Sequence, residues 1–101
     1  MAFVRWCRLN GIFVYAIPNG GARNAITGKR LKDEGVLPGV PDLFLPELKL
    51  FIEMKAPNGY CSEYQKQMIF DLQQAGYNVA VCHSADEAMQ IVKCFKHLGE
   101  K

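Results

Sequence analysis

Asp42, Glu53 and Lys55 are the residues whose types and spacing could perform chemistry. Glu53 and Lys55 interrupt an otherwise apolar run, 50–56. If this run is a β-strand, the alternation of side chains places Phe51, Glu53 and Lys55 on the same face. A carboxylate and an ammonium group would then point in the same direction.

Asp42 stands at the start of a neighbouring apolar run, and a turn near Pro46 and Glu47 would fold the two runs into a hairpin. The hairpin would bring the carboxylates of Asp42 and Glu53 toward each other. Two converging carboxylates raise each other's pKa unless a cation lies between them, and a hard divalent metal suits such a site. An isolated Glu-x-Lys is more often a solvated strand face, and a Pro-Asp pair is a common turn. Taken alone, the three residues leave both interpretations open.

The elements that must position these residues follow from the hydrophobic pattern. In chain order it predicts a helix ending at Gly11, strands at about 12–17, 41–45 and 48–56, a helix at 62–76, a strand at 77–82 and a helix beginning at 84–87. The last strand follows a helical crossover, so it can lie parallel to an earlier strand. The sequence therefore predicts a single α/β domain, 1–101, with a mixed sheet of about four strands flanked by helices.

Both later helices carry start signals and apolar stripes. Ser62 and Gln65 form a capping box, as do the residues at 84–87. The predicted buried stripes are Tyr64, Met68, Leu72 and Ala75 in the first of these helices, and Ala88, Ile91, Val92, Phe95 and Leu98 in the second.

The composition of the chain excludes several classes of protein. Half of the residues are hydrophobic and 22% are charged, which excludes intrinsic disorder. No apolar run approaches the roughly 18–20 residues of a membrane span, and the first ten residues do not resemble a signal peptide. We therefore expect a soluble protein of the cytoplasm, in a bacterial cell or a phage-infected host.

The charge is unevenly distributed. The net charge is +2, but residues 1–32 carry six bases and no acid, whereas the remaining six bases and ten acids sum to −4. This asymmetry suggests one electropositive face, although a chance run of solvated bases would also produce it.

The cysteines are widely spaced and predict reduced core thiols rather than a disulfide or a zinc site. They are Cys7, Cys61, Cys82 and Cys94, and the only histidines available to a metal are His83 and His97.

The segment between the first two predicted strands, 18–39, holds five glycines and little periodicity, which is typical of a functional loop. Its motifs, Ile17-Pro-Asn-Gly-Gly-Ala-Arg23 and Gly35-Val-Leu-Pro-Gly-Val-Pro-Asp42, are followed by Glu53-Met-Lys55 and Gln65. This order and approximate spacing closely resemble the VRR-NUC (virus-type replication-repair nuclease) family, a branch of the PD-(D/E)xK restriction-endonuclease-like superfamily. The resemblance spans about 12–87, and it is to the stand-alone phage and bacterial members.

The resemblance implies roles for the hairpin residues. Asp42 and Glu53 would bind Mg²⁺ or Mn²⁺ together with the backbone carbonyl of Met54. The metal would polarise a phosphodiester and lower the pKa of a bound water. Lys55 would orient or help deprotonate that water and offset charge in the transition state, although a lysine here is also a simple counter-ion.

The resemblance also implies contacts outside the hairpin. It places Gln65 in the active site, whereas the capping box alone would explain this residue, and one rotamer would not be expected to serve both roles fully. Asn19 would contact DNA, although a glycine-rich turn would also explain it. The bases that would contact DNA phosphates without reading sequence are Arg23, Lys29, Arg30 and Lys32, and each could equally be merely solvated.

One feature departs from the family. Its members carry a metal-binding glutamate on the first helix, but this sequence has no acid before Asp33. A sequence that begins late, a site with two carboxylates, or substitution by Asp33 or Glu34 would each account for the difference.

The resemblance therefore implies a metal-dependent, structure-specific endodeoxyribonuclease of DNA repair. We expect a symmetric homodimer on branched DNA such as a four-way (Holliday) junction, because two-fold symmetry would place two active sites on opposed strands. The alternatives are a monomeric nickase or flap nuclease, and a catalytically weak nucleic-acid-binding module. A pure binding module has no need for a repulsive carboxylate pair, which argues against the last alternative.

Overall fold

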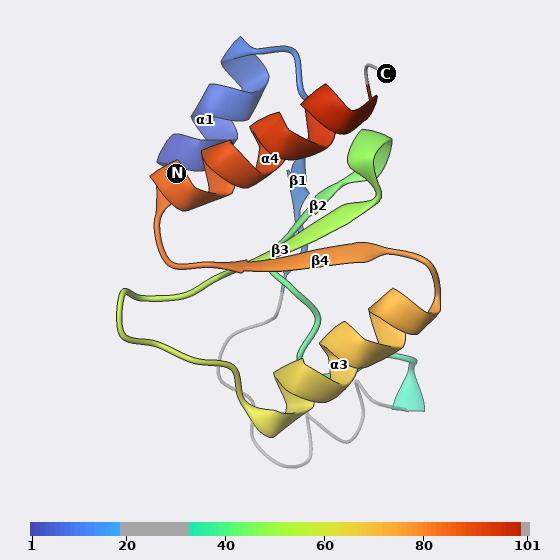
Figure 1. The fold of residues 1–101 in the computed structure, drawn as a ribbon. Helices are drawn as coiled ribbons and strands as arrows, with labels where there is room; N and C mark the ends of the chain where they lie inside the picture. The colour runs from blue at the N-terminus through green and yellow to red at the C-terminus, as the bar shows by residue number, and fades with distance from the viewer. Residues whose placement is uncertain (19–32, 100–101) are drawn as a thin grey trace.

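The fold is an α/β arrangement around one mixed sheet (Figure 1). The computed structural model describes residues 1–18 and 33–99. In chain order the elements are α1 (Ala2–Leu9), β1 (Tyr15–Ala16), β2 (Leu43–Leu45), the 3₁₀ helix η1 (Pro46–Leu48), β3 (Leu50–Met54), α3 (Glu63–Gln74), β4 (Asn78–Cys82) and α4 (Ala85–Gly99).

The four strands lie in the order β1-β2-β3-β4. β1 pairs antiparallel with β2, and β2 pairs antiparallel with β3. After the α3 crossover, β4 pairs parallel with β3, with Glu53 beside Val81 and Met54 beside Cys82. The prediction of a mixed four-stranded sheet flanked by helices is confirmed.

The two faces of the sheet are covered differently. In Figure 1, α1 and α4 lie side by side over one face, and α3 lies on the other. The core is on the side of α1 and α4. Its fully buried apolar residues are Phe3 and Cys7 of α1, Leu43 and Leu45 of β2, Leu50 and Ile52 of β3, Cys82 of β4, and Ala88 and Val92 of α4. Alternation in β3 therefore sends Leu50 and Ile52 into the core and Phe51 and Glu53 to the α3 side.

The α3 side of the sheet is only partly covered. α3 contains no fully buried residue, and Tyr64, predicted to be buried, is 69% exposed. Ala75 is also exposed, so the predicted stripe of this helix is wrong at both ends. Aromatic rings cross the sheet on this side, from β1 to the residue before β4, with Phe44 and Phe51 stacked at 4.3 Å between ring centroids. We call Phe13, Tyr15, Phe44, Phe51 and Tyr77 the aromatic row.

Several local expectations need correction. The predicted strand at 12–17 is regular only at Tyr15–Ala16, although Ile12 and Val14 are buried in the core. The turn between β2 and β3 is the 3₁₀ helix η1, which ends at Lys49 with a left-handed φ of 49°. In α4 the hydroxyl of Ser84 accepts from the Glu87 amide as predicted, but the Glu87 carboxylate accepts from the His83 amide, one residue earlier than in a capping box.

All four cysteines are free thiols, but only two are core residues. Burial raises the pKa of Cys7 and of Cys82 to about 11 in each case, so both stay protonated at neutral pH. Cys61 is half-buried and Cys94 is exposed, which corrects the prediction of a core position for them. Within 1–18 and 33–99, none of the helices is long and apolar enough to cross a membrane.

Candidate active site

Glu53 lies at the centre of the candidate site. β3 directs its side chain toward α3, and the residue is only 4% exposed. Its Oε2 atom accepts a hydrogen bond from Gln65 Nε2 at 3.1 Å and lies 3.5 Å from Lys55 Nζ. Its Oε1 atom is buried without a hydrogen-bond partner in the described residues.

Asp42 is fixed beside Glu53 by the backbone. Its Oδ2 atom accepts a hydrogen bond from the Met54 amide at 2.8 Å, and its carbonyl oxygen accepts from the Ile17 amide at 2.7 Å. These bonds tie the residue before β2 to the end of β3 and to the residue after β1. The hairpin therefore brings the two carboxylates together, as the spacing predicts.

Burial is the main reason why the pKa of Glu53 is raised, and the nearby charge of Asp42 raises it further. Lys55 acts in the opposite direction, through its positive charge and its hydrogen bond. The balance is a raised pKa, so one lysine does not compensate fully for the burial of this carboxylate beside another.

Gln65 joins both functions that the sequence offered as alternatives. Its Oε1 atom accepts from the Ser62 amide at 2.8 Å and from Lys55 Nζ at 2.7 Å, while its Nε2 atom donates to Glu53. The Ser62 hydroxyl accepts from the Gln65 amide in return, which completes the capping box. One rotamer thus caps α3 and contacts both Glu53 and Lys55, so the expectation that one rotamer would not make both sets of contacts fully is wrong.

A divalent cation suits this donor set. Asp42 and Glu53 supply carboxylate oxygens, which Mg²⁺ and Mn²⁺ prefer, and Glu53 Oε1 is a buried acceptor that no described residue donates to. An unpartnered buried carboxylate oxygen is costly, and a bound cation would remove that cost.

Among the described residues, the candidate site contains two carboxylates, those of Asp42 and Glu53. Among residues 1–18 and 33–99, no group of three or more acidic, histidine or cysteine side chains is placed to hold a metal. α1 contains no acid, and Asp33 and Glu34 are exposed and do not complete such a group with Asp42 and Glu53. The described residues thus give no support to substitution by Asp33 or Glu34.

The predicted DNA contacts at Asn19, Arg23, Lys29, Arg30 and Lys32 lie outside the described residues. Their roles stay predictions, as do the catalytic roles of the hairpin residues.

Gly39 is a positioning residue that the sequence did not single out. Its φ is +86°, and a Cβ atom there would lie 2.6 Å from the carbonyl oxygen of Tyr64. The segment leading to Asp42 can approach the first turn of α3 this closely only without a side chain. The Pro38-Gly39 pair signalled a turn, but the approach of α3 depends on tertiary structure.

The fold and its motifs agree with known proteins. The model of the VRR-NUC domain family matches residues 4–86. A solved structure described as a VRR_NUC domain protein superposes with a TM-score of 0.68 at 24% sequence identity, covering 85% of this chain and 69% of that chain. At this identity the likeness concerns the fold. A comparison with curated proteins found no match.

Proposed function

Because the chain belongs to the VRR-NUC family and has its nuclease-type fold, we propose that it is a metal-dependent endodeoxyribonuclease that hydrolyses phosphodiester bonds in branched DNA. The observation that carries this proposal is the buried Glu53 carboxylate, with one oxygen unpartnered and the other held by Gln65, beside Asp42 and Lys55. A merely structural ion pair would not need a second, half-buried carboxylate that raises the pKa of the first.

Asp42 and Glu53, with the backbone carbonyl of Met54, would hold Mg²⁺ or Mn²⁺. Such an ion, when bound, polarises a phosphodiester and makes an attacking water more acidic. The Met54 amide already fixes Asp42, and Gln65 fixes Glu53, so both carboxylates are oriented before a ligand arrives.

Lys55 would supply positive charge where the transition state becomes more negative. Its ammonium is held by Gln65 Oε1 at 2.7 Å, and its side chain is only 17% exposed. A charge that is restrained and partly shielded from water stabilises a developing negative charge more than a mobile one. The same ammonium would also orient the attacking water by donating a hydrogen bond to it.

A symmetric homodimer is the form that we propose acts on four-way junctions. One copy carries one carboxylate–lysine site, and junction resolution needs two opposed nicks. The aromatic row supports a second copy as partner, because Phe13 is 57% and Tyr15 45% exposed, and contiguous apolar patches mark interfaces. A monomeric nickase or flap nuclease, and a weak binding module, are the competing outcomes.

The test is cleavage of labelled single strands, duplexes, flaps, forks and four-way junctions in Mg²⁺, Mn²⁺ or EDTA. We expect metal-dependent paired nicks in the junction. Asp42→Asn, Glu53→Gln and Lys55→Ala should each reduce the rate by at least about a hundredfold while DNA binding persists, because each removes a ligand or a stabilising charge. Parental cleavage by Glu53→Gln would remove the assignment, and binding without cleavage by the parent would favour the binding module.

A further inference from the structure

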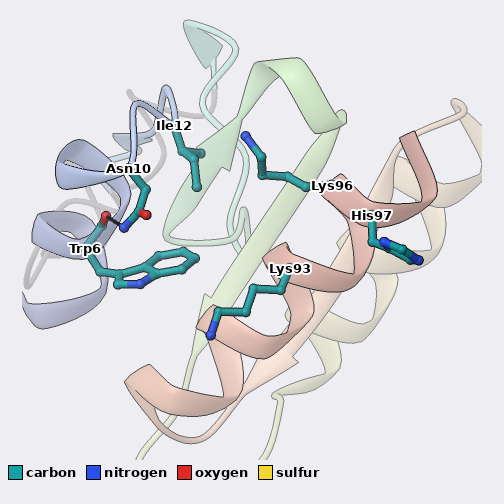
Figure 2. Close-up of a pocket in the computed structure, with 6 residues that line it drawn as sticks. All are labelled: Trp6, Asn10, Ile12, Lys93, Lys96 and His97. Carbon is teal, nitrogen blue, oxygen red and sulfur yellow. Dashed lines mark hydrogen bonds between the residues drawn. The ribbon is translucent and has the colours of Figure 1, made fainter. Parts of the chain in front are cut away.

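A hollow between α1 and α4 lies on the side of the sheet away from the candidate active site. Its volume is about 430 Å³. We call it the α1/α4 hollow, and its lining residues are Trp6, Asn10, Ile12, Lys93, Lys96 and His97. Figure 2 shows the indole of Trp6 directed from α1 toward α4 and the side chain of Lys96 reaching toward Ile12, whereas His97 points away from Trp6.

The described lining of the hollow carries positive charge. No acidic residue lines it, and within 1–18 and 33–99 neither Lys93 nor Lys96 takes part in an ion pair. α1 contains no acid, and its Arg5 and Arg8 are exposed. The acids of the described part of α4 are in its first turn, about 10 Å along the axis from Lys93 at 1.5 Å per residue.

Trp6 gives the hollow an aromatic surface. The Lys93 ammonium lies 5.9 Å from the centroid of the indole, and Asn10 Nδ2 donates to the Trp6 carbonyl oxygen at 2.8 Å, which fixes the rim. Phe3 stacks behind Trp6 with 6.1 Å between ring centroids. The favourable effect of cations near a helix C-terminus would explain Lys96, but Lys93 precedes the last turn and lies against a partly exposed aromatic ring.

We propose that the α1/α4 hollow binds a nucleic-acid backbone, with Lys93 and Lys96 contacting phosphates and Trp6 presenting its ring to a sugar or base. Adjacent basic and aromatic groups are the combination by which proteins hold nucleic acids without reading sequence. This inference rests on the proposed function, and it assigns a second DNA contact to the same protein.

The position of the hollow determines which DNA could use it. The carboxylate–lysine site faces α3, whereas the hollow lies in the layer of α1 and α4 across the sheet. The two surfaces therefore lie on opposite faces of the sheet, with the sheet between them. A straight duplex on one surface does not reach the other, and a branched molecule with diverging arms can.

Trp6 makes the test direct, because it is the only tryptophan of the chain. Its fluorescence is followed in EDTA while a blunt duplex or a four-way junction is added, and binding is measured in parallel from the anisotropy of labelled DNA. We expect junction binding to quench Trp6 with the same midpoint as the anisotropy change.

The variant Lys93→Ala/Lys96→Ala should lose most of the quench. A plot of its log affinity against log salt concentration should have a slope shallower by about 2, because each lost phosphate contact reduces the slope by roughly 0.9. Alanine suits an exposed helix position, so folding should be retained, which the thermal melt checks. Lys66→Ala is the matched control, because Lys66 is an exposed helical lysine on α3, and it should keep the parental quench.

Junction binding that leaves the Trp6 fluorescence unchanged would overturn the proposal that the α1/α4 hollow binds DNA, while leaving the proposed function intact. Absence of any DNA binding would overturn both. Quenching by a polyglutamate peptide but not by DNA would identify a docking site for an acidic protein and would also overturn the proposal.

Discussion

The Glu53 carboxylate combines deep burial, a neighbouring carboxylate and an unpartnered oxygen. Each of these features disfavours its charged form, and Lys55 together with the hydrogen bond from Gln65 opposes them. The folded protein therefore holds a proton on Glu53 more tightly than the unfolded chain does. A cation would replace that proton, so metal binding and proton release are coupled at this residue.

This coupling predicts a pH-dependent stability in EDTA. Because the pKa of Glu53 in the folded protein is raised from its ordinary value of 4.5, its contribution to stability is complete below that value and is lost as pH rises through the raised pKa. Melting temperatures of the parent should fall relative to Glu53→Gln across this window and then level off. A constant difference between the two proteins at all pH values would contradict the shift.

Metal should reverse the loss at neutral pH. Binding to the folded state alone stabilises it by about 2.7 kcal/mol when the metal concentration is a hundred times the Kd. The melting temperature of the parent should therefore rise with Mn²⁺, and that of Glu53→Gln should rise much less. Equal melting temperatures of the parent in millimolar Mn²⁺ and in EDTA would mean that no such site forms.

Much of the arrangement of the site's side chains was predictable from the sequence, and the reason is geometric. Alternation along one strand is a local rule, so it correctly placed Glu53 and Lys55 on one face. The double use of Gln65 was not predictable, because it depends on how far α3 stands from β3. A capping box describes the helix end alone and says nothing about what lies opposite it.

At the scale of elements, the first turn of α3 and the end of β3 form one structural unit through Gln65. Gln65→Glu separates the two functions of this side chain. A glutamate keeps an acceptor for the Ser62 amide and for Lys55, but it replaces the donor to Glu53 by a third carboxylate. In EDTA we expect the variant to lose about 1–3 kcal/mol of stability and to melt at a lower temperature than the parent. Mn²⁺ should raise its melting temperature more than it raises that of the parent.

The control for this variant is Ser62→Ala, which removes the hydroxyl acceptor and costs about 1 kcal/mol of stability. It leaves the contacts of Gln65 with Glu53 and Lys55 in place. Its melting temperature should fall in EDTA and in Mn²⁺ alike. If Gln65→Glu behaves in the same way, the contact between Gln65 and Glu53 has no electrostatic role.

Gly39 tests how closely the segment before β2 must approach α3. Gly39→Ala places a Cβ 2.6 Å from the Tyr64 carbonyl, whereas Gly35→Ala meets nothing within 4 Å. Both glycines have positive φ, +86° and +96°, so both variants carry a similar backbone penalty of about 1 kcal/mol. We expect Gly39→Ala to lose more stability and more cleavage activity than Gly35→Ala, in melts and rate assays. Equal losses would show that the close approach is dispensable.

Element types followed from the sequence more faithfully than burial did. The Ser62 cap and the crossover to β4 were predicted from local signals, and both are present. The stripe of α3 was wrong because helical spacing predicts which residues share a face, but not whether a neighbouring element covers that face. The 3₁₀ helix between β2 and β3 was missed because Pro46 and Glu47 suit several kinds of turn.

At the scale of the whole molecule, the aromatic row is the surface that a homodimer would bury. Light scattering should give twice the chain mass of 11.4 kDa for the parent. Tyr15→Glu places a charge within the row and should yield the single-chain mass, because burying an unpaired charge is costly. Tyr60→Glu is the control, since Tyr60 is 85% exposed and makes no ring contact within the row. A parent of single-chain mass that makes unpaired nicks in a junction would refute the dimer.

The packing of α1 against α4 also has a consequence for synthesis of the protein. Phe3 and Cys7 emerge from the ribosome before Ala88 and Val92, which join them in the core and lie more than 80 residues after Phe3. At about 5–20 residues synthesised per second, the apolar face of α1 stays without its packing partner α4 for a time on the order of several seconds. β4, the parallel partner of β3, is also made late. A nascent chain can therefore pair β2 with β3 before β4 and α4 are made, so the candidate site is completed only after these two elements have emerged.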